Sequence, residues 1–419
     1  MDQFLIRNMS KNILLLTTMY PSKLRISTPI CHLFVKQWQK MGYDVRVVYF
    51  RSMFPAVYSS LARLFPKTAE RFIGNQAELD TNYDVVKYEH DGVKVMSPPI
   101  YKYIPHRGYP KSSVKKAKMQ ILEFLKEEGM TPDIIIGHFY NPQMELLSQL
   151  KKDFPKAKTC VVLHESSLDT VKLSYAKNYQ ELFNSIDIVG YRSLPIRLAF
   201  EGQLNPKPKA FLAYSGVSEA FLSTAPEREW KSGPMRNFIY VGQFIKRKFP
   251  CEVTDALLSV YPEKDYHLTY VGREELLFDE VKQYVASKGA ADITTFTGQI
   301  PRNAIIEHLD KSDCFIMISK AEVFGLVYLE AMARGCITIA AKNEGMQGII
   351  EDGVNGFLCE AGNVDELASI IERINKLTAT EKKQISDAGR KTAEEMSDYN
   401  VAKAYIEAVE NSRSNGKEQ

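Results

Sequence analysis

The strongest constraint on the fold is an alternation of short apolar runs with amphipathic segments, which occurs twice along the chain. The first run, residues 12–18 (NILLLTT), is followed by a loop, a helix-like segment that ends at Gly42, and a second run, DVRVVYF. A continuous apolar run is typical of a parallel strand that is buried on both faces. The pattern therefore predicts a βαβ unit that opens a doubly wound α/β sheet.

The alternation continues to about residue 213 and restarts after a polar stretch at residues 223–234. The later strand-like runs lie at 132–139, 159–165, 186–191, 237–244, 266–272, 293–298, 313–319 and 336–341. We therefore predict two doubly wound domains, residues 1–213 and 214–395, with a hinge between about 210 and 236. A terminal amphipathic helix is expected within residues 396–412. Since open α/β sheets bind ligands at the carboxyl ends of their strands, we expect both domains to face one interdomain cleft.

Charge is distributed unevenly, although the net charge of the whole chain is only +3. Residues 1–225 hold 30 Lys+Arg against 20 Asp+Glu, and residues 226–419 hold 24 against 31. A basic first half is consistent with an anionic partner, and a chance asymmetry of solvated faces explains the counts equally well.

Cysteines and apolar segments set the expected environment. The six cysteines are widely scattered and form no C-x-x-C pair, which fits a reducing cytoplasm and argues against a zinc site. The apolar run near the start, Ile13 to Leu16, is four residues long, too short for a signal-peptide core or a membrane span. We expect a cytoplasmic protein that is soluble or lies on a membrane surface.

The segment KAEVFGLVYLEAMARG (320–335) carries the chemistry that the sequence indicates most clearly. On one continuous helix, Glu322 and Glu330 would be turned about 80° apart and could not share a face. Good helix formers begin near Leu326, and Gly335 is placed to end the helix. Glu322 is therefore expected in the loop, and Glu330 about one turn inside the helix.

The start of that predicted helix would expose the amides of residues 324–327 beside a glycine that permits close approach, which is a site for an anion. Carboxylates accept hydrogen bonds from hydroxyls. An acid, a row of amides and a second acid suit a ligand with hydroxyls at both ends and phosphate between them. A nucleotide sugar has this layout. The plainer alternative is a surface loop that leads into a buried helix.

This segment resembles the E-x7-E motif of retaining, family 4-type glycosyltransferases with the GT-B fold. The resemblance implies that Glu330 binds the ribose hydroxyls of the donor and that Glu322 contacts the donor sugar. It also implies that the amides of Phe324, Gly325 and Leu326 hold the diphosphate and the sugar. A GT-B fold consists of two Rossmann-like domains that face each other across a cleft, with the acceptor on the N-terminal domain and the nucleotide sugar on the C-terminal domain.

The stretch NFIYVGQFIKRK (237–248) resembles the family's G-R-x4-K-G turn, which would begin at Gly242. The resemblance implies that Lys248 neutralises the donor phosphate. Gln243 stands where the family has arginine and Phe249 where it has glycine, so that Lys246 or Arg247 is a candidate replacement cation. A cluster of basic residues in a solvated turn is the alternative.

Three further stretches of the second half match the family more weakly. FTGQIPRNAI (296–305) resembles a turn whose backbone meets the base, near Gln299 and Ile300. YVGREEL (270–276) resembles a glycine turn in which Glu274 replaces the second glycine. KNEGMQG (342–348) keeps one glycine of a pair, as Gly345, and has Glu344 in place of the other.

In the first half, CVVLHESS (160–167) resembles a strand that ends in His-Gly-x-Asp, with Glu165 in place of the glycine. The resemblance implies that His164 lies beside the reacting sugar, and a strand-end histidine with a structural hydrogen bond is the alternative. For His138 we expect a structural role. The loop at 18–34 lacks the family's glycine-rich turn, so that Arg25, Ser27 and His32 are either acceptor-pocket residues or part of a plain connection.

Two stretches bear on a membrane partner: residues 53–72 mix aromatic and basic side chains, and residues 110–120 are basic. Together they could contact an anionic membrane that carries a lipid-linked acceptor. A core-packing helix and a solvated charge run explain them as well. We see no aromatic-basic pattern that indicates nucleic acid.

The resemblance as a whole implies a glycosyltransferase that moves a hexose-type sugar, with retention, from a UDP- or GDP-sugar to a hydroxyl acceptor, in the synthesis of a cell-surface polysaccharide or glycoconjugate. We expect no cofactor beyond the donor, and no metal because no D-x-D stands in a strand-end loop. The departures at Gln243, Phe249, Glu274, Glu344 and Glu165 leave a non-catalytic nucleotide-sugar-binding or scaffolding subunit as the alternative. An epimerase or phosphorylase of the same fold fits the motif less well.

Overall fold

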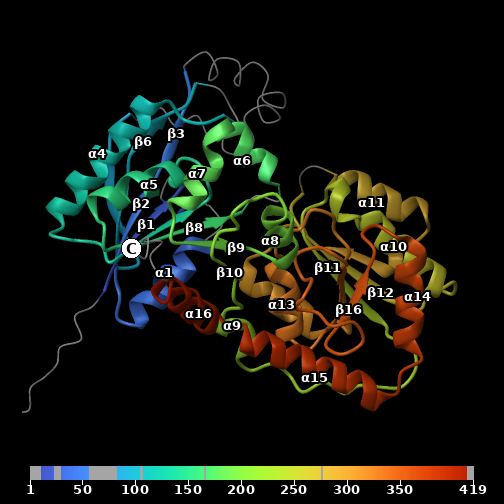
Figure 1. Ribbon diagram of the computed structural model, residues 1–419. Helices are drawn as coiled ribbons and strands as arrows, with labels where there is room; N and C mark the ends of the chain where they lie inside the picture. The colour runs from blue at the N-terminus through green and yellow to red at the C-terminus, as the bar shows by residue number, and fades with distance from the viewer. Residues whose placement is uncertain are drawn as a thin grey trace, which may run out of the picture. The chain divides into compact units, whose positions relative to one another are not determined.

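A computed structural model describes residues 11–22, 30–55, 83–103, 107–164, 167–274 and 277–412, and the chain divides into two compact units (Figure 1). The first unit holds Met1–Arg192, Ile196–Ala213 and Ala402–Gln419, and the second holds Ser193–Pro195 and Tyr214–Val401. Each unit is described by itself below. Among the described residues, no helix has both the length and the apolar composition that crossing a membrane would require.

An eight-stranded sheet in the order β10-β9-β8-β7-β1-β2-β5-β4 forms the centre of the first unit. Its strands are β1 (Asn12–Thr17), β2 (Asp44–Tyr49), β4 (Val86–His90), β5 (Val93–Ser97), β7 (Ile134–His138), β8 (Lys158–Leu163), β9 (Ile188–Tyr191) and β10 (Ala210–Leu212). Every pair is parallel except β4 with β5. The apolar run of β1 lies between β2 and β7 with Ile13 to Leu16 wholly buried, as a central parallel strand requires.

A second, small sheet of the first unit pairs β3 (Arg51–Met53) with β6 (Pro99–Tyr101). The helices are α1 (Ile30–Lys40), α4 (Lys111–Glu127), α5 (Gln143–Asp153), α6 (Leu168–Tyr175), α7 (Tyr179–Asn184) and α8 (Leu194–Glu201), with a 3₁₀ turn, η1 (Ala176–Asn178). Helix α1 buries Phe34, Val35 and Trp38 along one stripe, which is the spacing of an amphipathic helix.

The second unit has a six-stranded, wholly parallel sheet in the order β13-β12-β11-β14-β15-β16. Its strands are β11 (Asn237–Val241), β12 (His267–Val271), β13 (Thr294–Phe296), β14 (Cys314–Met317), β15 (Ile337–Ala341) and β16 (Phe357–Cys359). The order reverses at β11 and β14, and this topological switch point is where an open parallel sheet binds its ligand.

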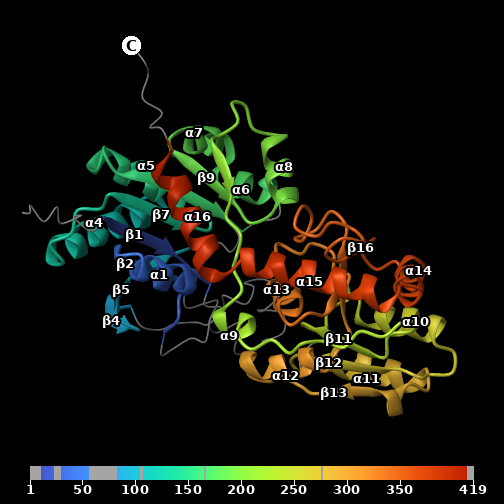
Figure 2. The ribbon, with the colours of Figure 1, turned by 90° about the horizontal axis from the view of Figure 1, so that it is seen from below.

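The helices of the second unit are α9 (Glu219–Leu222), α10 (Pro250–Val260), α11 (Phe278–Ser287), α12 (Ile305–Asp310), α13 (Leu326–Ala333), α14 (Val364–Asn375) and α15 (Ala379–Glu395). Three 3₁₀ turns accompany them: η2 (Lys246–Lys248), η3 (Ala291–Ile293) and η4 (Arg302–Ala304). Helix α13 is the short helix that the E-x7-E segment predicts, and α15 runs beside it (Figure 2). A capping box of Thr378 and Glu381 begins α15.

The terminal helix α16 (Asp398–Glu410) has its first turn in the second unit and the rest in the first. Within the first unit, Trp38 donates its indole N–H to the carbonyl of Ala402 (3.0 Å), and Tyr405 packs edge-on against the same indole ring. These contacts hold the buried face of the terminal helix against α1.

The fold class predicted from the sequence is confirmed: each unit is an α/β layer structure with a mostly parallel sheet. The sequence analysis did not predict β3, β4, β5, β6, β10 and β16. These strands are short or lie at or near sheet edges, and β4 (VKYEH), at the end of the strand order, has exposed charged residues at alternate positions.

Candidate donor site of the second unit

Helix α13 begins where the motif predicts, and Gly325 is the residue that makes the entry possible. Gly325 has φ +83°, and a Cβ at this position would lie 2.4 Å from the ring of Tyr328. Only glycine accommodates both the left-handed backbone and the close ring. The entry leaves the first amides of the helix, from Leu326 onward, at the carboxyl end of β14.

Glu322 lies in the loop before this helix and is held by two side chains. Its carboxylate is 3.3 Å from the Nζ atom of Lys248, and Ser319 donates its hydroxyl to the same carboxylate oxygen (3.2 Å). The carboxylate and the ammonium group are both largely buried. The structure thus brings together two of the predicted catalytic residues, which come from the ends of adjacent strands β14 and β11.

Glu344, a departure from the family pattern, braces the same loop. Its carboxylate accepts the backbone N–H of Glu322 (2.8 Å), so that an acid on the loop after β15 fixes the backbone of the first motif acid. The next residue, Gly345, lies so close to Phe324 that a Cβ would be 2.5 Å from its carbonyl oxygen. This packing requires glycine at position 345. Position 344 can hold the larger side chain of glutamate.

The turn after β11 carries the predicted phosphate-binding residues. Gly242 donates its N–H to the carbonyl of Val271 (2.9 Å), and the exposed Gln243 follows it. The turn then forms η2 and reaches Phe249, which has φ +52°. A left-handed conformation favours glycine, which is the family residue, and here the Phe249 ring lies against Gly362 instead.

Arg247, a candidate replacement for the missing arginine, is bonded to the loop that carries Glu322. Its guanidinium donates to the carbonyls of Lys320 (3.2 Å) and Ala321 (3.3 Å), and its own carbonyl accepts the N–H of Lys320 (2.7 Å). Arg247 therefore ties η2 to the loop of Glu322. Lys248 remains the cation that faces the motif acid.

Glu330 is one turn inside α13, with 4% of its side chain exposed. Arg302, the first residue of η4, donates its Nε to the Oε1 atom of Glu330 (2.7 Å), and its Nη2 forms an ion pair with the same oxygen. Burial raises the pKa of Glu330, and the charge and hydrogen bond of Arg302 act in the opposite direction. Sequence reasoning missed Arg302 because no family motif marks its position.

The predicted base-binding turn leads directly into η4. Ile300 packs against the core of the second unit, and Gln299 beside it is exposed. Gly298, with φ +68°, lies against the carboxylate of Glu274, which is the acid that replaces a family glycine. Ile300 thus precedes Arg302, the cation bonded to Glu330, by two residues.

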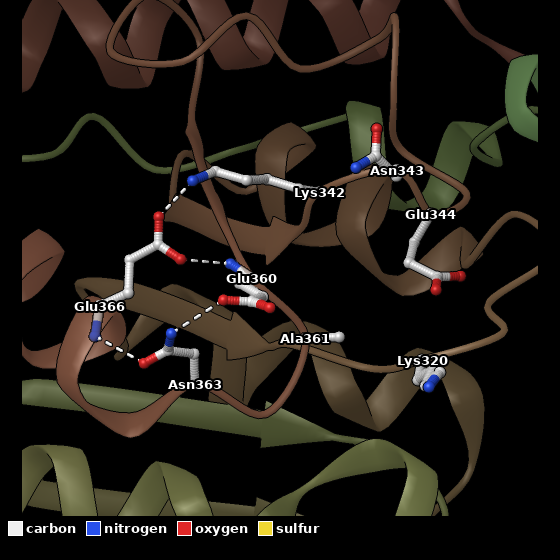
Figure 3. A pocket seen from close by; sticks show the side chains of 8 residues that line it. All are labelled: Lys320, Lys342, Asn343, Glu344, Glu360, Ala361, Asn363 and Glu366. Carbon is white, nitrogen blue, oxygen red and sulfur yellow. Dashed lines mark hydrogen bonds and ion pairs between the residues drawn. The ribbon is translucent and has the colours of Figure 1, made fainter.

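A polar pocket of about 560 Å³ lies at the carboxyl ends of β14, β15 and β16, next to the Glu322 loop (Figure 3). Figure 3 shows Glu344 and Lys320 on one side and the network of Lys342, Glu366 and Asn363 on the other. Glu344 both lines this pocket and supports Glu322. The pocket therefore lies beside Glu322, the residue predicted to contact the donor sugar, along the same edge of the sheet.

In the first unit, His164 follows β8 and pairs with the fully buried His138 of β7. The Nδ1 atom of His138 is 3.0 Å from the Nε2 atom of His164, and Tyr405 of α16 lies 3.2 Å from the other nitrogen of His138. Phe139 stacks on His164. Burial lowers the pKa of His138 to about 3 and that of His164 well below its usual value, so both imidazoles are neutral at pH 7.

His32 belongs to a separate cluster. Its Nδ1 atom is 2.8 Å from the hydroxyl of Tyr20, and its Nε2 atom is 3.0 Å from a carboxylate oxygen of Asp91, with the ring of His90 alongside. His32, His90 and Asp91 place metal-binding atoms within 4.8 Å of one another. The contact of His32 with Asp91 links helix α1 to the β4–β5 turn. Lys36 of the same helix donates to the carbonyl of Asp91 (2.8 Å) and strengthens this link. A structural link therefore explains the cluster without a metal.

Several predicted positions lie outside the described residues: Arg25, Ser27, Glu165 and most of 53–72. The basic stretch at 110–120 forms the start of α4, which buries Val114, Ala117 and Ile121 and leaves Lys111, Lys115 and Lys116 exposed. This is an ordinary amphipathic helix, and membrane contact stays a prediction.

Solved structures define the class of the fold. The chain superposes on the trehalose-6-phosphate structure from E. coli bound with UDP-2-fluoro glucose with a TM-score of 0.68 and 10% identity, over 96% of this chain and 99% of that one. The structural neighbours are GT-B glycosyltransferases. At this level of identity the likeness shows the fold alone, and it confirms the predicted GT-B fold.

Sequence comparisons relate the chain to one group of glycosyltransferases. Residues 227–392 match the model of the family described as glycosyl transferases group 1. An uncharacterized glycosyltransferase of Methanocaldococcus jannaschii is 25% identical over 60% of this chain and 67% of its own length. A candidate teichuronic acid biosynthesis glycosyltransferase of Bacillus subtilis is 23% identical over 77% of this chain and 78% of its own length. Together these findings support a group 1 glycosyltransferase.

Proposed function

We propose that this protein transfers a hexose-type sugar, with retention of anomeric configuration, from a UDP- or GDP-sugar to a hydroxyl acceptor. One observation carries the proposal: Lys248 and Glu322 form a pair 3.3 Å apart at the start of α13, and Glu330 lies one turn further along the same helix. The first acid matches the sugar, the cation and the helix amides match the diphosphate, and the second acid matches the ribose.

The proposed roles follow from charge and position. As the donor bond breaks, negative charge grows on the diphosphate, and Lys248 and the amides near Gly325 would stabilise it. Glu322 is bound to Lys248 and Ser319, so we assign it to the sugar hydroxyls rather than to nucleophilic attack. The diphosphate itself would then accept the proton of the acceptor hydroxyl on the same face, which retains the configuration. His164 of the first unit is proposed to lie beside the reacting sugar.

The donor and the pathway rest on similarity. UDP-2-fluoro glucose is bound in the E. coli neighbour, and the Bacillus relative is a candidate for teichuronic acid synthesis. We therefore propose a nucleoside diphosphate sugar as donor and a role in cell-surface polysaccharide or glycoconjugate synthesis. A lipid-linked acceptor with peripheral membrane contact through Lys111, Lys115 and Lys116 is the corresponding partner proposal.

A binding screen followed by product analysis tests the function. UDP-, GDP- and ADP-sugars are screened by thermal shift, because a ligand at 100 times its Kd stabilises a fold by about 2.7 kcal/mol. The sugar released slowly from the stabilising donor is then analysed by NMR, and we expect the anomer of the donor. Inverted product would contradict retention. Binding without hydrolysis or transfer would favour the non-catalytic subunit, and no binding would contradict the donor site.

A further inference from the structure

Arg302, whose side chain is 34% exposed, forms an ion pair with the buried Glu330 that the roles proposed above do not use. Two nitrogens of Arg302, Nε and Nη2, are directed at the same carboxylate oxygen, Oε1. In the part of the chain that the structure describes, the other oxygen of Glu330, Oε2, has no hydrogen-bond partner. The pair therefore fixes one side of the carboxylate and leaves the other side free.

The guanidinium of Arg302 is held in place from more than one side. Its carbon lies 5.7 Å from the ring centre of Phe221, on the face of that aromatic ring. Arg302 follows Pro301, whose fixed backbone and carbonyl, bonded by the N–H of Ala304 (2.9 Å), begin the η4 turn. A side chain that is stacked, paired and set on a short rigid turn is preorganised to orient its partner.

The electrostatic consequence follows from burial. A carboxylate that is 4% exposed is poorly solvated, which raises the pKa of Glu330, and the adjacent Arg302 cation lowers that pKa and so favours the ionised form. An ionised carboxylate accepts hydrogen bonds from hydroxyls through both oxygens, whereas a protonated one offers fewer acceptor positions. The ion pair thus preserves the form of Glu330 that recognises hydroxyls.

We propose that Arg302 is the positioning residue for ribose recognition: it locks Glu330 in one rotamer, ionised, with Oε2 presented to the ribose hydroxyls of the donor nucleotide. This inference rests on the proposed function, because it needs a nucleotide at Glu330. Since Arg302 follows the turn of Gln299 and Ile300 that is predicted to meet the base, it also links base contact to ribose contact.

An alternative role for Arg302 predicts the opposite effect on nucleotide binding. If Arg302 occupied the position of the ribose, the nucleotide would have to displace it. Removing Arg302 would then strengthen nucleotide binding. If Arg302 positions Glu330, removing it weakens the binding of a nucleotide that has ribose hydroxyls and leaves a nucleotide without them unaffected.

The test compares ribonucleotides with deoxynucleotides. Affinities of UDP, GDP and ADP and of their 2′-deoxy and 3′-deoxy forms are measured by calorimetry for the wild type, Arg302→Met, Arg302→Gln and Arg302→Lys. The matched control is Arg236→Met, which removes an arginine from an exposed pair with Asp265 in the same unit. Melting temperatures confirm that each variant is folded, and Arg302→Gln replaces Arg302→Met if the latter is not.

We expect the wild type and Arg236→Met to prefer the ribonucleotide, and Arg302→Met to lose about tenfold or more of that preference, the range of a hydrogen bond to a charged group. The loss should appear in the ribonucleotide affinity alone and should be greater at lower pH, because Glu330 without its cation is protonated more easily. Arg302→Lys, which keeps the charge, should show a smaller dependence on pH than Arg302→Met.

An unchanged preference in Arg302→Met, or a tighter ribonucleotide, would overturn the inference while leaving the proposed donor site intact. A wild type that binds no nucleoside diphosphate would instead contradict the proposed function, and this inference with it.

Discussion

Lys248 lies beside the motif acid Glu322 in the second unit. Its ammonium group is 3.3 Å from the Glu322 carboxylate and 3.6 Å from the sulfur of Met317. A bound diphosphate would bring further negative charge to the same cation. We therefore propose that Lys248 acts on the phosphates and on no other part of the nucleotide.

Replacing Lys248 by methionine should weaken nucleoside diphosphate binding by about 1.5 to 3 kcal/mol, the range of a hydrogen bond to a charged group. The affinity for the corresponding nucleoside should not change. Calorimetry with UDP and uridine, or with GDP and guanosine, measures the ratio. The control is Lys282→Met, an exposed lysine of α11. An equal loss for the nucleoside would show that Lys248 acts through the fold and not on phosphate.

The buried imidazole of His138 makes stability sensitive to acid. Its pKa is about 3 in the folded protein, whereas an unfolded histidine titrates near 6.5. The unfolded state therefore binds the extra proton as pH falls below about 6.5, and folding loses about 2 kcal/mol at pH 5 from this group. The contribution of His138 to the free energy of unfolding is fully present above pH 6.5, the pKa of an unfolded histidine, and is lost progressively as the pH falls toward 3.

The variant His138→Gln should lose less stability between pH 7 and pH 5 than the wild type does, even if it is less stable at both. Urea denaturation at the two pH values measures the difference. His308→Gln, in the second unit, serves as the control for a histidine outside the pair. Equal acid sensitivity of His138→Gln and the wild type would contradict a neutral buried imidazole.

At the scale of elements, the entry into α13 depends on a backbone that only glycine adopts without strain. Gly325→Ala would bring a Cβ to 2.4 Å from the Tyr328 ring, in addition to the strain at φ +83°. Gly233→Ala has similar strain, with φ +93°, but meets nothing within 4 Å. The comparison separates the ring contact from the strain.

We expect Gly233→Ala to cost about 1 kcal/mol of folding free energy and Gly325→Ala clearly more, about 2 to 4 kcal/mol with a shifted helix start. Thermal denaturation measures both, and donor affinity should fall for Gly325→Ala alone. Equal costs for the two variants would show that the Tyr328 ring yields to the added methyl group.

The same scale shows what the sequence could predict. The central parallel strands were predictable because burial on both faces demands continuous apolar runs, as in β1 and β14. The edge hairpin β4–β5 was not, since its outer strand follows no such rule. Within the site, Glu322, Glu330 and Lys248 stand in a motif. The pairing of Arg302 with Glu330 joins the η4 turn to helix α13, which meet only in the fold. The contact of Glu344 with Glu322 could not be predicted either, because in the sequence Glu344 is only a departure from the family pattern.

The whole molecule consists of two compact α/β units, and we propose that they divide the chemistry between them. The family match covers residues 227–392, which lie wholly within the second unit, and the predicted donor residues are there. The first unit carries His164 and the exposed lysines of α4. We therefore predict that donor-site variants change nucleotide binding, and we propose that the first unit determines acceptor choice.

Turnover of a nucleotide sugar tests the central claim most directly. The purified full-length chain is incubated with radiolabelled UDP- and GDP-sugars, and release of the nucleoside diphosphate is followed for the wild type, Glu322→Gln and the exposed-residue control Glu263→Gln. We predict slow release by the wild type and the control, and a loss of about 100-fold or more in Glu322→Gln, the scale of a lost transition-state contact. Equal release by all three proteins, or none by the wild type despite donor binding, would contradict the account.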